Sequence, residues 1–413
     1  MVLPLEGYLM LDLSRLVPGP MATWMLADLG MDVLKVEEME VARAGRARDS
    51  FSPIVDDPDT EARAMAWNFV GRNKRSIPIN LRSPEGQEIF HKLAAKADVI
   101  FESYRRGVVN RLGADYETVK AINPRIIYCS LSGYGAEGQY ADWPGQELNA
   151  QGMSGVGALV GDPDTGEPAY LHYPLVDTYA AACVVISIQS AILARERTGE
   201  GQFIDISITE AGVSLINQAS VGYLRDGYVP SRCAVTGISP IRCKDGKYLT
   251  NASTAETHFW NRFCQAIGRP QYENVFPIPF DRRAAAAVDP EIQGIIKDVK
   301  DVMLTKTRDE WMEIIPVDIS VTPLLELDEA LEGEYARDRG VLWEMEHPVA
   351  GKVRQISSPF RLSETPPKFR NFAPMLGENT LEVLEELGYD ESSIERMERE
   401  GIVRVSRWSP PPA

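Results

Sequence analysis

The sequence predicts an α/β protein in which helices cover both faces of a parallel sheet. Short apolar runs alternate with helical patterns over the first 130 residues, and this alternation is typical of strand–helix–strand units. The length of 413 residues is enough for two or three domains with a large core. The composition, 44% hydrophobic and 25% charged, is that of an ordinary globular protein.

Strands and helices are expected in a regular order along the N-terminal half. Apolar runs predict strands at 8–13, 33–36, 76–81, 98–102, 125–131 and 203–208. A first helix should begin near Met21 and end at Gly30. A second should be capped by Ser83, with Pro84 as its first residue. A third should run over 116–122 and end before a proline.

The longest apolar stretch, Thr178–Ala194, predicts a buried helix. It has 17 residues and contains Ser187, Gln189 and Ser190, whereas a bilayer span needs about 20 mostly apolar residues. We therefore expect a core helix over about 177–197. The preceding residues, 133–170, are rich in Gly, Asp and Pro, and we expect them to form loops.

The sequence pattern changes near residue 225 to shorter, polar segments interrupted by proline, and changes again near 341. These changes predict three segments: 1–224, 225–340 and 341–413. In the middle segment, Cys243–Asn251 should form a hairpin with an Asp-Gly turn, and 281–340 should be mostly helical. The final segment contains a further helical pattern, ENTLEVLEELG.

Charge and cysteine usage restrict the partners and the compartment. The net charge of −17 disfavours nucleic acid and anionic membranes as partners. The five cysteines form no CxxC pair, which argues against a disulfide framework or structural zinc and fits a reducing compartment. The N-terminus lacks the pattern of a signal peptide. We expect a cytoplasmic protein.

Common cofactor and catalytic motifs find no support. The glycines at 155, 157 and 161 have the wrong spacing and context for dinucleotide binding. The sequence has no P-loop and no GxSxG nucleophile motif. Its four histidines are far apart and form no metal-binding pattern, so no metal is predicted.

Asp177 is the carboxylate that chemistry singles out. It precedes the apolar helix, where the dipole and unpaired N–H groups favour an acid. Two interpretations stay open at this point, and the structural one includes the N-cap of the helix as well as its first turn. Asp177 is either a structural residue of the first turn, or a nucleophile held ionised by those amides, which then stabilise an oxyanion.

Basic residues flank two of the predicted strands. They are Lys74, Arg75, Arg82, Arg105, Arg106 and Arg111. If they lie near the carboxyl edge of a parallel sheet, they form a positive region suited to a phosphate-rich ligand. The alternative is a solvated charged face.

Seven segments resemble the family III CoA-transferases, which include formyl-CoA transferase, carnitine CoA-transferase and the α-methylacyl-CoA racemases. They are LDLSRLVPGPMATWMLADLGMDVLKVE (from Leu11), RNKRSIPINLRSPEGQEIF (from Arg72), ADVIFESYRRGVVNRLG (from Ala97), NPRIIYCSLSGYG (from Asn123), RTGEGQFIDISITEA (from Arg197), CKDGKYLT (from Cys243) and APMLGENTLEVLEELGYD (from Ala373). The segments follow the family's order over nearly the whole chain. The resemblance implies a Rossmann-like large domain whose parallel sheet is built from both chain ends, a smaller middle α+β domain, and an interlocked dimer.

The resemblance also implies an activity. Asp177 matches the family's catalytic aspartate, which forms a covalent aspartyl-CoA thioester while coenzyme A passes from an acyl-CoA to a free carboxylic acid. Coenzyme A is then the transferred group, and no permanently bound cofactor is expected. Succinyl-CoA is a candidate donor by family habit.

The coenzyme A site carries over by position. The matching residues are Val17, Pro18, Ile79, Asn80, Leu81, Arg82, Ser103, Tyr104, Arg105, Arg111, Gln146 and Glu147. Val17 stands where the formyl-CoA enzyme has a glutamine, so a formyl–oxalate substrate pair is disfavoured. Glu38 stands where the family has an arginine at the nucleotide end.

Two alternative functions remain open. A racemase needs a histidine paired with the aspartate, but the histidine's position holds Gln146, although Glu256 aligns with a glutamate of the racemase branch. Alternatively, the chain is a non-catalytic subunit that pairs with a paralogous subunit in a heteromeric transferase, rather than forming a homodimer.

Overall fold

The computed structural model describes residues 2–38, 57–161, 167–169, 171–229, 238–278 and 289–408. The chain divides into two compact units. The larger comprises Met1–Gly155, Leu171–Leu215 and Gly340–Ala413, and the smaller comprises Val156–Tyr170 and Ile216–Arg339. The predicted boundaries lay at 225 and 341, and the smaller unit also takes in a segment that the sequence assigned to the N-terminal part.

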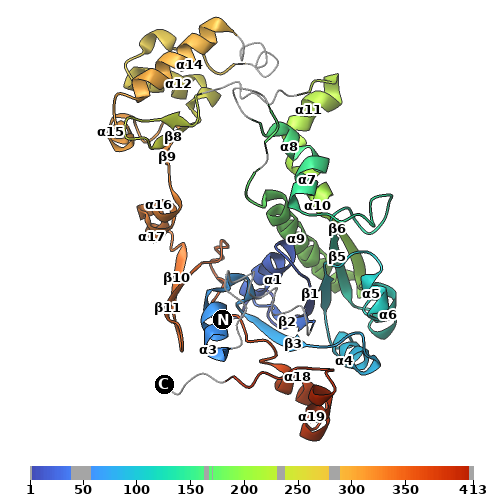
Figure 1. The fold of residues 1–413 in the computed structure, drawn as a ribbon. Helices are drawn as coiled ribbons and strands as arrows, with labels where there is room; N and C mark the ends of the chain where they lie inside the picture. Colours follow the sequence, from blue (N-terminus) through green and yellow to red (C-terminus); the bar gives the residue numbers. More distant parts are fainter. Residues whose placement is uncertain are drawn as a thin grey trace. The chain divides into compact units, whose positions relative to one another are not determined.

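The larger unit is built on a six-stranded sheet in the order β3-β2-β1-β4-β5-β6 (Figure 1). The strands are β1 (Leu9–Leu13), β2 (Asp32–Glu37), β3 (Lys74–Pro78), β4 (Val99–Glu102), β5 (Ile127–Ser132) and β6 (Gln202–Ser207). All neighbouring strands are parallel, which confirms the predicted α/β class. The strand order reverses between β1 and β4, and ligands of such sheets bind beside this point, at the carboxyl ends of the strands.

Helices cover both faces of the sheet. Those of the N-terminal part are α1 (Pro18–Asp28), α3 (Pro58–Trp67), α4 (Pro84–Ala94), α5 (Val108–Arg111) and α6 (Tyr116–Ile122). Ser83 caps α4 as predicted, because its Oγ accepts the N–H of Gly86 at 3.0 Å. One face of the sheet packs Leu11 and Ile100 with Phe90 of α4 and Val119 of α6 in a single hydrophobic cluster.

α9 (Leu175–Thr198) is the long apolar helix that the sequence predicted. By length and composition alone this described helix would be able to cross a membrane, but half of its most apolar window is buried inside the protein. It contacts α1, β5, β6, α7 (Glu147–Ser154) and α10 (Ile208–Leu215). α9 is therefore a core helix of the larger unit.

The C-terminal segment returns to the larger unit but does not extend its parallel sheet. It forms a separate antiparallel pair, β10 (Leu342–His347) with β11 (Gly351–Ile356), followed by α18 (Thr380–Glu386) and α19 (Glu391–Arg399). Residues of both helices join the core cluster under the sheet. The expectation of a parallel sheet built from both chain ends is thus corrected: within the described residues, the six strands all come from positions 9–207.

The smaller unit combines helices with a three-stranded antiparallel sheet. The sheet consists of β7 (Ile241–Arg242), β8 (Tyr248–Asn251) and β9 (Val321–Leu324). The predicted hairpin is present, with Gly246 at a φ of +81° in its turn. The helices include α11 (Asn217–Asp226), α12 (Thr257–Ala266), α14 (Pro290–Met303), α15 (Arg308–Ile314), α16 (Leu327–Glu332) and α17 (Glu334–Asp338). Part of the region predicted to be helical, 281–288, lies outside the described residues.

The prediction of loops over 133–170 is wrong in part, because α7 and the short α8 (Val156–Leu159) lie there. The side chains of Gln146 and Asn149 form a capping box at the start of α7, and Gly155 ends it with a φ of +86°. α7 has only eight residues, so its stability comes from packing on α9 and α10 rather than from local propensity. A helix of this kind leaves no clear helical pattern in a glycine-rich sequence.

Candidate active site

Asp177 lies in the first turn of α9, and its side chain is only 9% exposed. The N-cap of the helix is Pro174, which offers no side-chain cap. Asp177 is therefore not an N-cap, and this excludes one form of the structural interpretation. Its burial at the amino end of a core helix instead gives a carboxylate in a fixed position, as a nucleophile requires.

Two N–H groups at the start of α9, which have no acceptor within the helix, donate hydrogen bonds to Glu147. Its Oε1 accepts the N–H of Val176 at 3.1 Å, and its Oε2 accepts the N–H of Asp177 at 2.7 Å. Gln151 holds this carboxylate from the other side, because its Nε2 donates to Glu147 Oε1 at 2.7 Å. The hypothesis that these amides bind the Asp177 carboxylate and later an oxyanion is therefore corrected.

A close approach of helices fixes the two carboxylates relative to each other. Gly212 of α10 faces α7 and α9, and a Cβ placed there would lie 2.6 Å from Cβ of Ser154 and 3.1 Å from Cγ1 of Val176. Only glycine fits this contact. The helices that carry Glu147 and Asp177 are thus held at one spacing by backbone packing.

The structure brings together two of the loops predicted to bind coenzyme A. The loop after β1 contains Val17, Pro18 begins α1 directly after it, and the loop after β4 contains Ser103–Arg105. Ser103 Oγ accepts the N–H of Arg15 at 2.7 Å, and the Arg15 guanidinium lies 4.9 Å from the centre of the Tyr104 ring. Both loops follow the strands at which the sheet order reverses, where ligands bind in this class of sheet.

A buried charge cluster anchors the loop after β1. Asp12 is fully buried, and its carboxylate accepts hydrogen bonds from Ser14 Oγ at 2.6 Å and from Thr23 Oγ1 at 2.8 Å. Lys35 Nζ lies 3.1 Å and Lys74 Nζ 3.7 Å from its oxygens. Burial alone would raise the pKa of Asp12, but these partners lower it to about 2.

In the third predicted segment, 79–82, mainly one side chain, that of Arg82, is accessible to a ligand. Ile79 and Leu81 are buried in the core cluster, and the N–H of Asn80 donates to the carbonyl of Ile402 at 2.8 Å. Arg82 alone is exposed. Any contact that the two apolar residues make with a ligand would come from their backbone.

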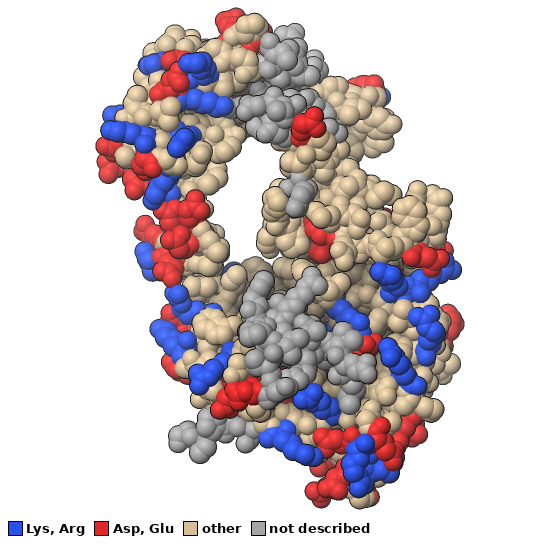
Figure 2. All heavy atoms as spheres, viewed as in Figure 1, with Lys and Arg blue, Asp and Glu red and all other residues tan. Residues whose placement is uncertain are grey.

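The basic residues predicted to form one positive region fall into two groups in the structure. Lys74 is buried against Asp12, and Arg75 pairs with Asp32 at 2.5 Å and with Glu382 at 3.5 Å. These two begin β3, at the opposite end of the strands from the expected ligand edge, so their inclusion in the ligand region is corrected. The arginines at 82, 105, 106 and 111 are exposed. In Figure 2, Lys and Arg side chains gather over the surface where α5 lies.

Glu38, Gln146 and Glu256 lie in three different settings. Glu38, which replaces a family arginine, forms an ion pair with Arg15 at 2.5 Å. Gln146 is exposed at the start of α7. Glu256 belongs to the smaller unit, where its Oε2 lies 3.6 Å from Nδ1 of His258.

Two functional candidates escaped the sequence analysis. Asp12 supports the loop after β1, and Glu102 ends β4 with only 3% of its surface exposed. Both are charged residues within otherwise apolar strand patterns, LMLDL and VIFE. A charged side chain in a buried strand costs free energy unless it is paired, and that interruption was the signal available in the sequence.

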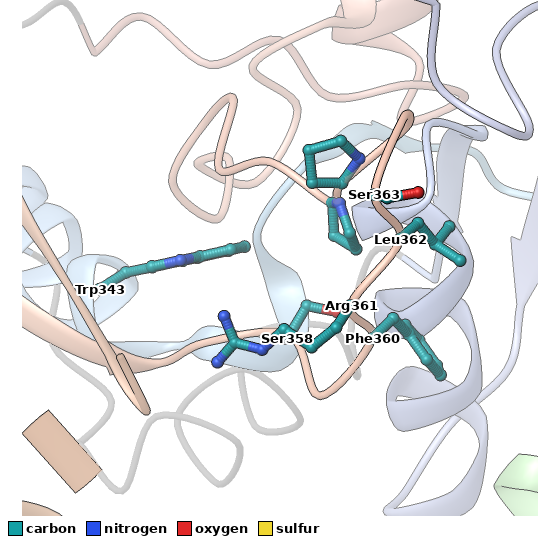
Figure 3. Close-up of a pocket in the computed structure, with 8 residues that line it drawn as sticks. Trp343, Ser358, Phe360, Arg361, Leu362 and Ser363 are labelled. Carbon is teal, nitrogen blue, oxygen red and sulfur yellow. The ribbon is translucent and has the colours of Figure 1, made fainter. Parts of the chain in front are cut away.

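A separate pocket of about 260 Å³ lies in the C-terminal part of the larger unit. It is lined by Trp343, Ser358, Phe360, Arg361, Leu362, Ser363, Pro366 and Pro367, and Figure 3 shows Trp343 opposite the loop segment that carries the others. None of the predicted site residues lines it. The Trp343 ring also stacks on the buried Arg72 guanidinium, 4.6 Å from the ring centre.

The chain matches known proteins over nearly its whole length. CoA-transferase family III matches residues 5–380. A succinate–glutarate CoA-transferase of Agrobacterium fabrum is 31% identical, with 93% of this chain and 96% of the relative covered. A succinyl-CoA:mesaconate CoA-transferase of Haloarcula marismortui is 30% identical, with 94% and 97% covered.

A solved structure extends the likeness to the fold. The crystal structure of a CaiB/BaiF family protein from Brucella suis superposes with a TM-score of 0.77 at 28% identity, covering 94% of this chain and 100% of that one. The match spans both units of the chain. The chain therefore belongs to CoA-transferase family III, and it is a CoA-transferase of the CaiB/BaiF fold.

Proposed function

We propose that the protein transfers coenzyme A from succinyl-CoA to a free dicarboxylic acid through a covalent thioester on Asp177. The observation that carries the proposal is the position of Asp177: a buried carboxylate in the first turn of a core helix, with its backbone N–H bound by Glu147. Family membership supplies the transfer reaction, and Asp177 is the residue that this geometry best suits to be the nucleophile.

The proposed first half-reaction consists of two acyl transfers. A carboxylate oxygen of Asp177 attacks the thioester carbonyl of succinyl-CoA, which forms a mixed anhydride and breaks the C–S bond to release the coenzyme A thiolate. The thiolate then attacks the aspartyl carbonyl of the anhydride. Succinate leaves with the electron pair of the broken C–O bond, and Asp177 carries coenzyme A as a thioester.

The second half-reaction repeats these steps with the acceptor. Its carboxylate attacks the aspartyl thioester, giving a new anhydride and free thiolate, and the thiolate attacks the acceptor's carbonyl. Acyl-CoA is released and the Asp177 carboxylate is regenerated. Charge, protons and oxidation state balance without a further reagent, so the reaction requires no bound cofactor beyond coenzyme A itself.

The substrate proposal rests on two relatives. Their names pair succinate with glutarate, and succinyl-CoA with mesaconate. Each of these acids has two carboxylates, one to react and one to orient the substrate. We therefore infer a succinyl donor and a dicarboxylic acceptor of four or five carbons, with glutarate and mesaconate as the acceptors to test first.

Intact-mass spectrometry tests the proposal directly. The purified full-length protein is incubated with succinyl-CoA, and a covalent adduct of the mass of coenzyme A is expected, removable by hydroxylamine. Asp177→Asn, which keeps the side-chain shape, should form no adduct, whereas Asp142→Asn, on an exposed loop residue, should form it normally. If wild-type protein binds coenzyme A but forms no adduct with any donor, the aspartyl mechanism is wrong.

The same samples separate the alternative functions. A racemase would exchange the α-proton of a 2-methylacyl-CoA for deuterium in D₂O without any covalent adduct. We expect no exchange, because the Gln146 amide cannot act as a general acid or base at neutral pH. A non-catalytic subunit would show neither reaction alone and would gain the adduct only when a paralogous chain is added.

The surface of α9 supports a homodimer. A helix that is apolar on all sides is normally buried on all sides, yet Ile186 and Leu193 of α9 are each 62% exposed. They lie seven positions apart and share one face of the helix. We propose that a second copy of the chain covers this face. Light scattering should give a dimer for wild type and a monomer or aggregate for Ile186→Glu, whereas a monomeric wild type would contradict the proposal.

A further inference from the structure

Glu102 is a buried carboxyl group that takes part in no step of the proposed reaction. Its side chain is 3% exposed. The strand register places it between Leu13 of β1 and Ser130 of β5, and Asp205 of β6 lies next to Ser130 in the same row. Such a group persists in a protein interior only when its hydrogen bonds are satisfied, so its partners indicate its role.

Those partners join the strand to the loop that follows it. Glu102 Oε2 accepts the N–H of Tyr104 at 2.7 Å, and the Ser130 hydroxyl bonds to the same carboxyl group. Tyr104 in turn carries the Arg15 guanidinium over its ring, and Ser103 binds the backbone of Arg15. Glu102 therefore fixes the loop after β4 and, through it, the loop after β1.

We propose that Glu102 is a positioning residue for coenzyme A, and that the protein takes up a proton on Glu102 when coenzyme A binds beside these two loops. The inference rests on the proposed function, because it assumes that coenzyme A occupies this edge of the sheet. Coenzyme A brings several phosphate charges. An anion near a carboxyl group favours its protonated form, and linkage then requires protonation to favour the bound anion equally.

The surroundings allow Glu102 to change charge near neutral pH. Burial raises the pKa of Glu102 to about 7 against the hydrogen bonds from Ser130 and Tyr104, which lower it, and the negative charge of Asp205 raises it further. On β1 its neighbour is Leu13, while Asp12 points to the opposite face of the sheet.

The other titratable groups around Glu102 do not exchange protons in this range. Burial raises the pKa of Tyr128 and of Cys129 on β5, and also that of Tyr104 in the loop. All three stay neutral between pH 6 and 8. Glu102 is thus the group in this cluster whose protonated form a nearby anion favours.

Proton uptake measured by calorimetry tests the proposal. Binding of coenzyme A at pH 7 is measured in two buffers of different ionisation enthalpy, for wild type and for Glu102→Gln. The glutamine keeps an oxygen for the N–H of Tyr104 and an N–H for Ser130, but it cannot titrate. Wild type should take up more protons than the variant. The phosphates of coenzyme A also titrate near pH 6, but their contribution cancels in the difference.

The pH dependence of affinity gives a second readout. If binding raises the pKa of Glu102 by one unit, coenzyme A should bind about fivefold more weakly at pH 8 than at pH 6, and Glu102→Gln should lose this factor. In steady-state assays the factor should appear in KM for the acyl-CoA and not in kcat. A change confined to kcat would contradict a positioning role.

Glu102→Gln changes a buried residue and could itself impair folding, so a variant at an exposed residue provides a second test. Asp205 is exposed and raises the pKa of Glu102, so Asp205→Asn should move the midpoint of the pH dependence to lower pH. An unchanged midpoint, or equal proton uptake by wild type and Glu102→Gln, would overturn the inference while leaving the transferase function intact. If wild type binds no coenzyme A, the proposed function itself fails.

Discussion

The carboxylate of Glu147 occupies the amino end of the helix that carries Asp177, with Oε2 2.7 Å from the Asp177 nitrogen. A helix start carries partial positive charge and unpaired N–H groups. In this protein a side chain of α7 fills that place. The position of the Asp177 turn is therefore coupled to the packing of α7, and Gln151 holds the coupling residue in turn.

Glu147→Ala should reduce both stability and activity. The change removes the acceptor of two N–H groups, which should lower the free energy of unfolding by about 1–2 kcal/mol. A displaced nucleophile should lower kcat/KM by about 100-fold. Glu147→Gln keeps an acceptor oxygen and should lose less. Thermal unfolding and initial rates measure these effects, with Glu137→Ala on an exposed loop as the control. Equal values for Glu147→Ala and wild type would contradict the coupling.

Gly212→Ala should disturb the site through backbone packing. The added methyl group would lie 2.6 Å from Ser154 Cβ, so α7 and α10 must move apart, at a cost of about 1–3 kcal/mol. Activity should fall with stability. Gly294→Ala is the matched control, because Gly294 lies inside α14 with nothing within 4 Å. That change should stabilise the protein by about 0.5–1 kcal/mol. Urea unfolding measures the free energy of unfolding of both variants. Equal values for Gly212→Ala and Gly294→Ala would contradict a close helix contact at Gly212.

Asp12→Ala should be strongly destabilising, because it leaves the ammonium groups of Lys35 and Lys74 without their buried carboxylate. Breaking a buried ion pair from one side costs about 3–5 kcal/mol. Asp309→Ala removes an exposed partner of Arg308 and should cost about 1 kcal/mol or less. Denaturant midpoints of the two variants should differ clearly, and similar midpoints would refute a supporting role for Asp12.

Stability should fall between pH 5 and pH 8 because of Glu102. The pKa of Glu102 is raised from 4.5 to about 7 in the folded state, so its favourable contribution is complete below 4.5 and is lost as the pH rises through 7. The loss amounts to about 3 kcal/mol. Glu102→Gln should remove this part of the slope. Unfolding free energies at several pH values measure it, and parallel curves for the two proteins would count against the buried titration.

Local patterns predicted the parallel sheet well. Strand runs, the Ser83 cap and the apolar helix near 177–197 appear within a few residues of their expected places, since each depends on neighbours along the chain. α7 was missed because its eight residues depend on contacts with α9 and α10. The roles of Lys74 and Arg75 were misjudged for a similar reason, because their partners Asp12 and Asp32 are far away in sequence.

The sequence by itself determined the fold class, the family and the candidate nucleophile, because periodicity, caps and motif order are properties of the chain alone. Only the tertiary structure decided how the site is assembled. It placed Glu147 on the amides that sequence reasoning assigned to Asp177, and it buried Glu102 between strands that are joined by long connections. Hydrogen bonds and burial between distant segments set these positions and the charges of their groups.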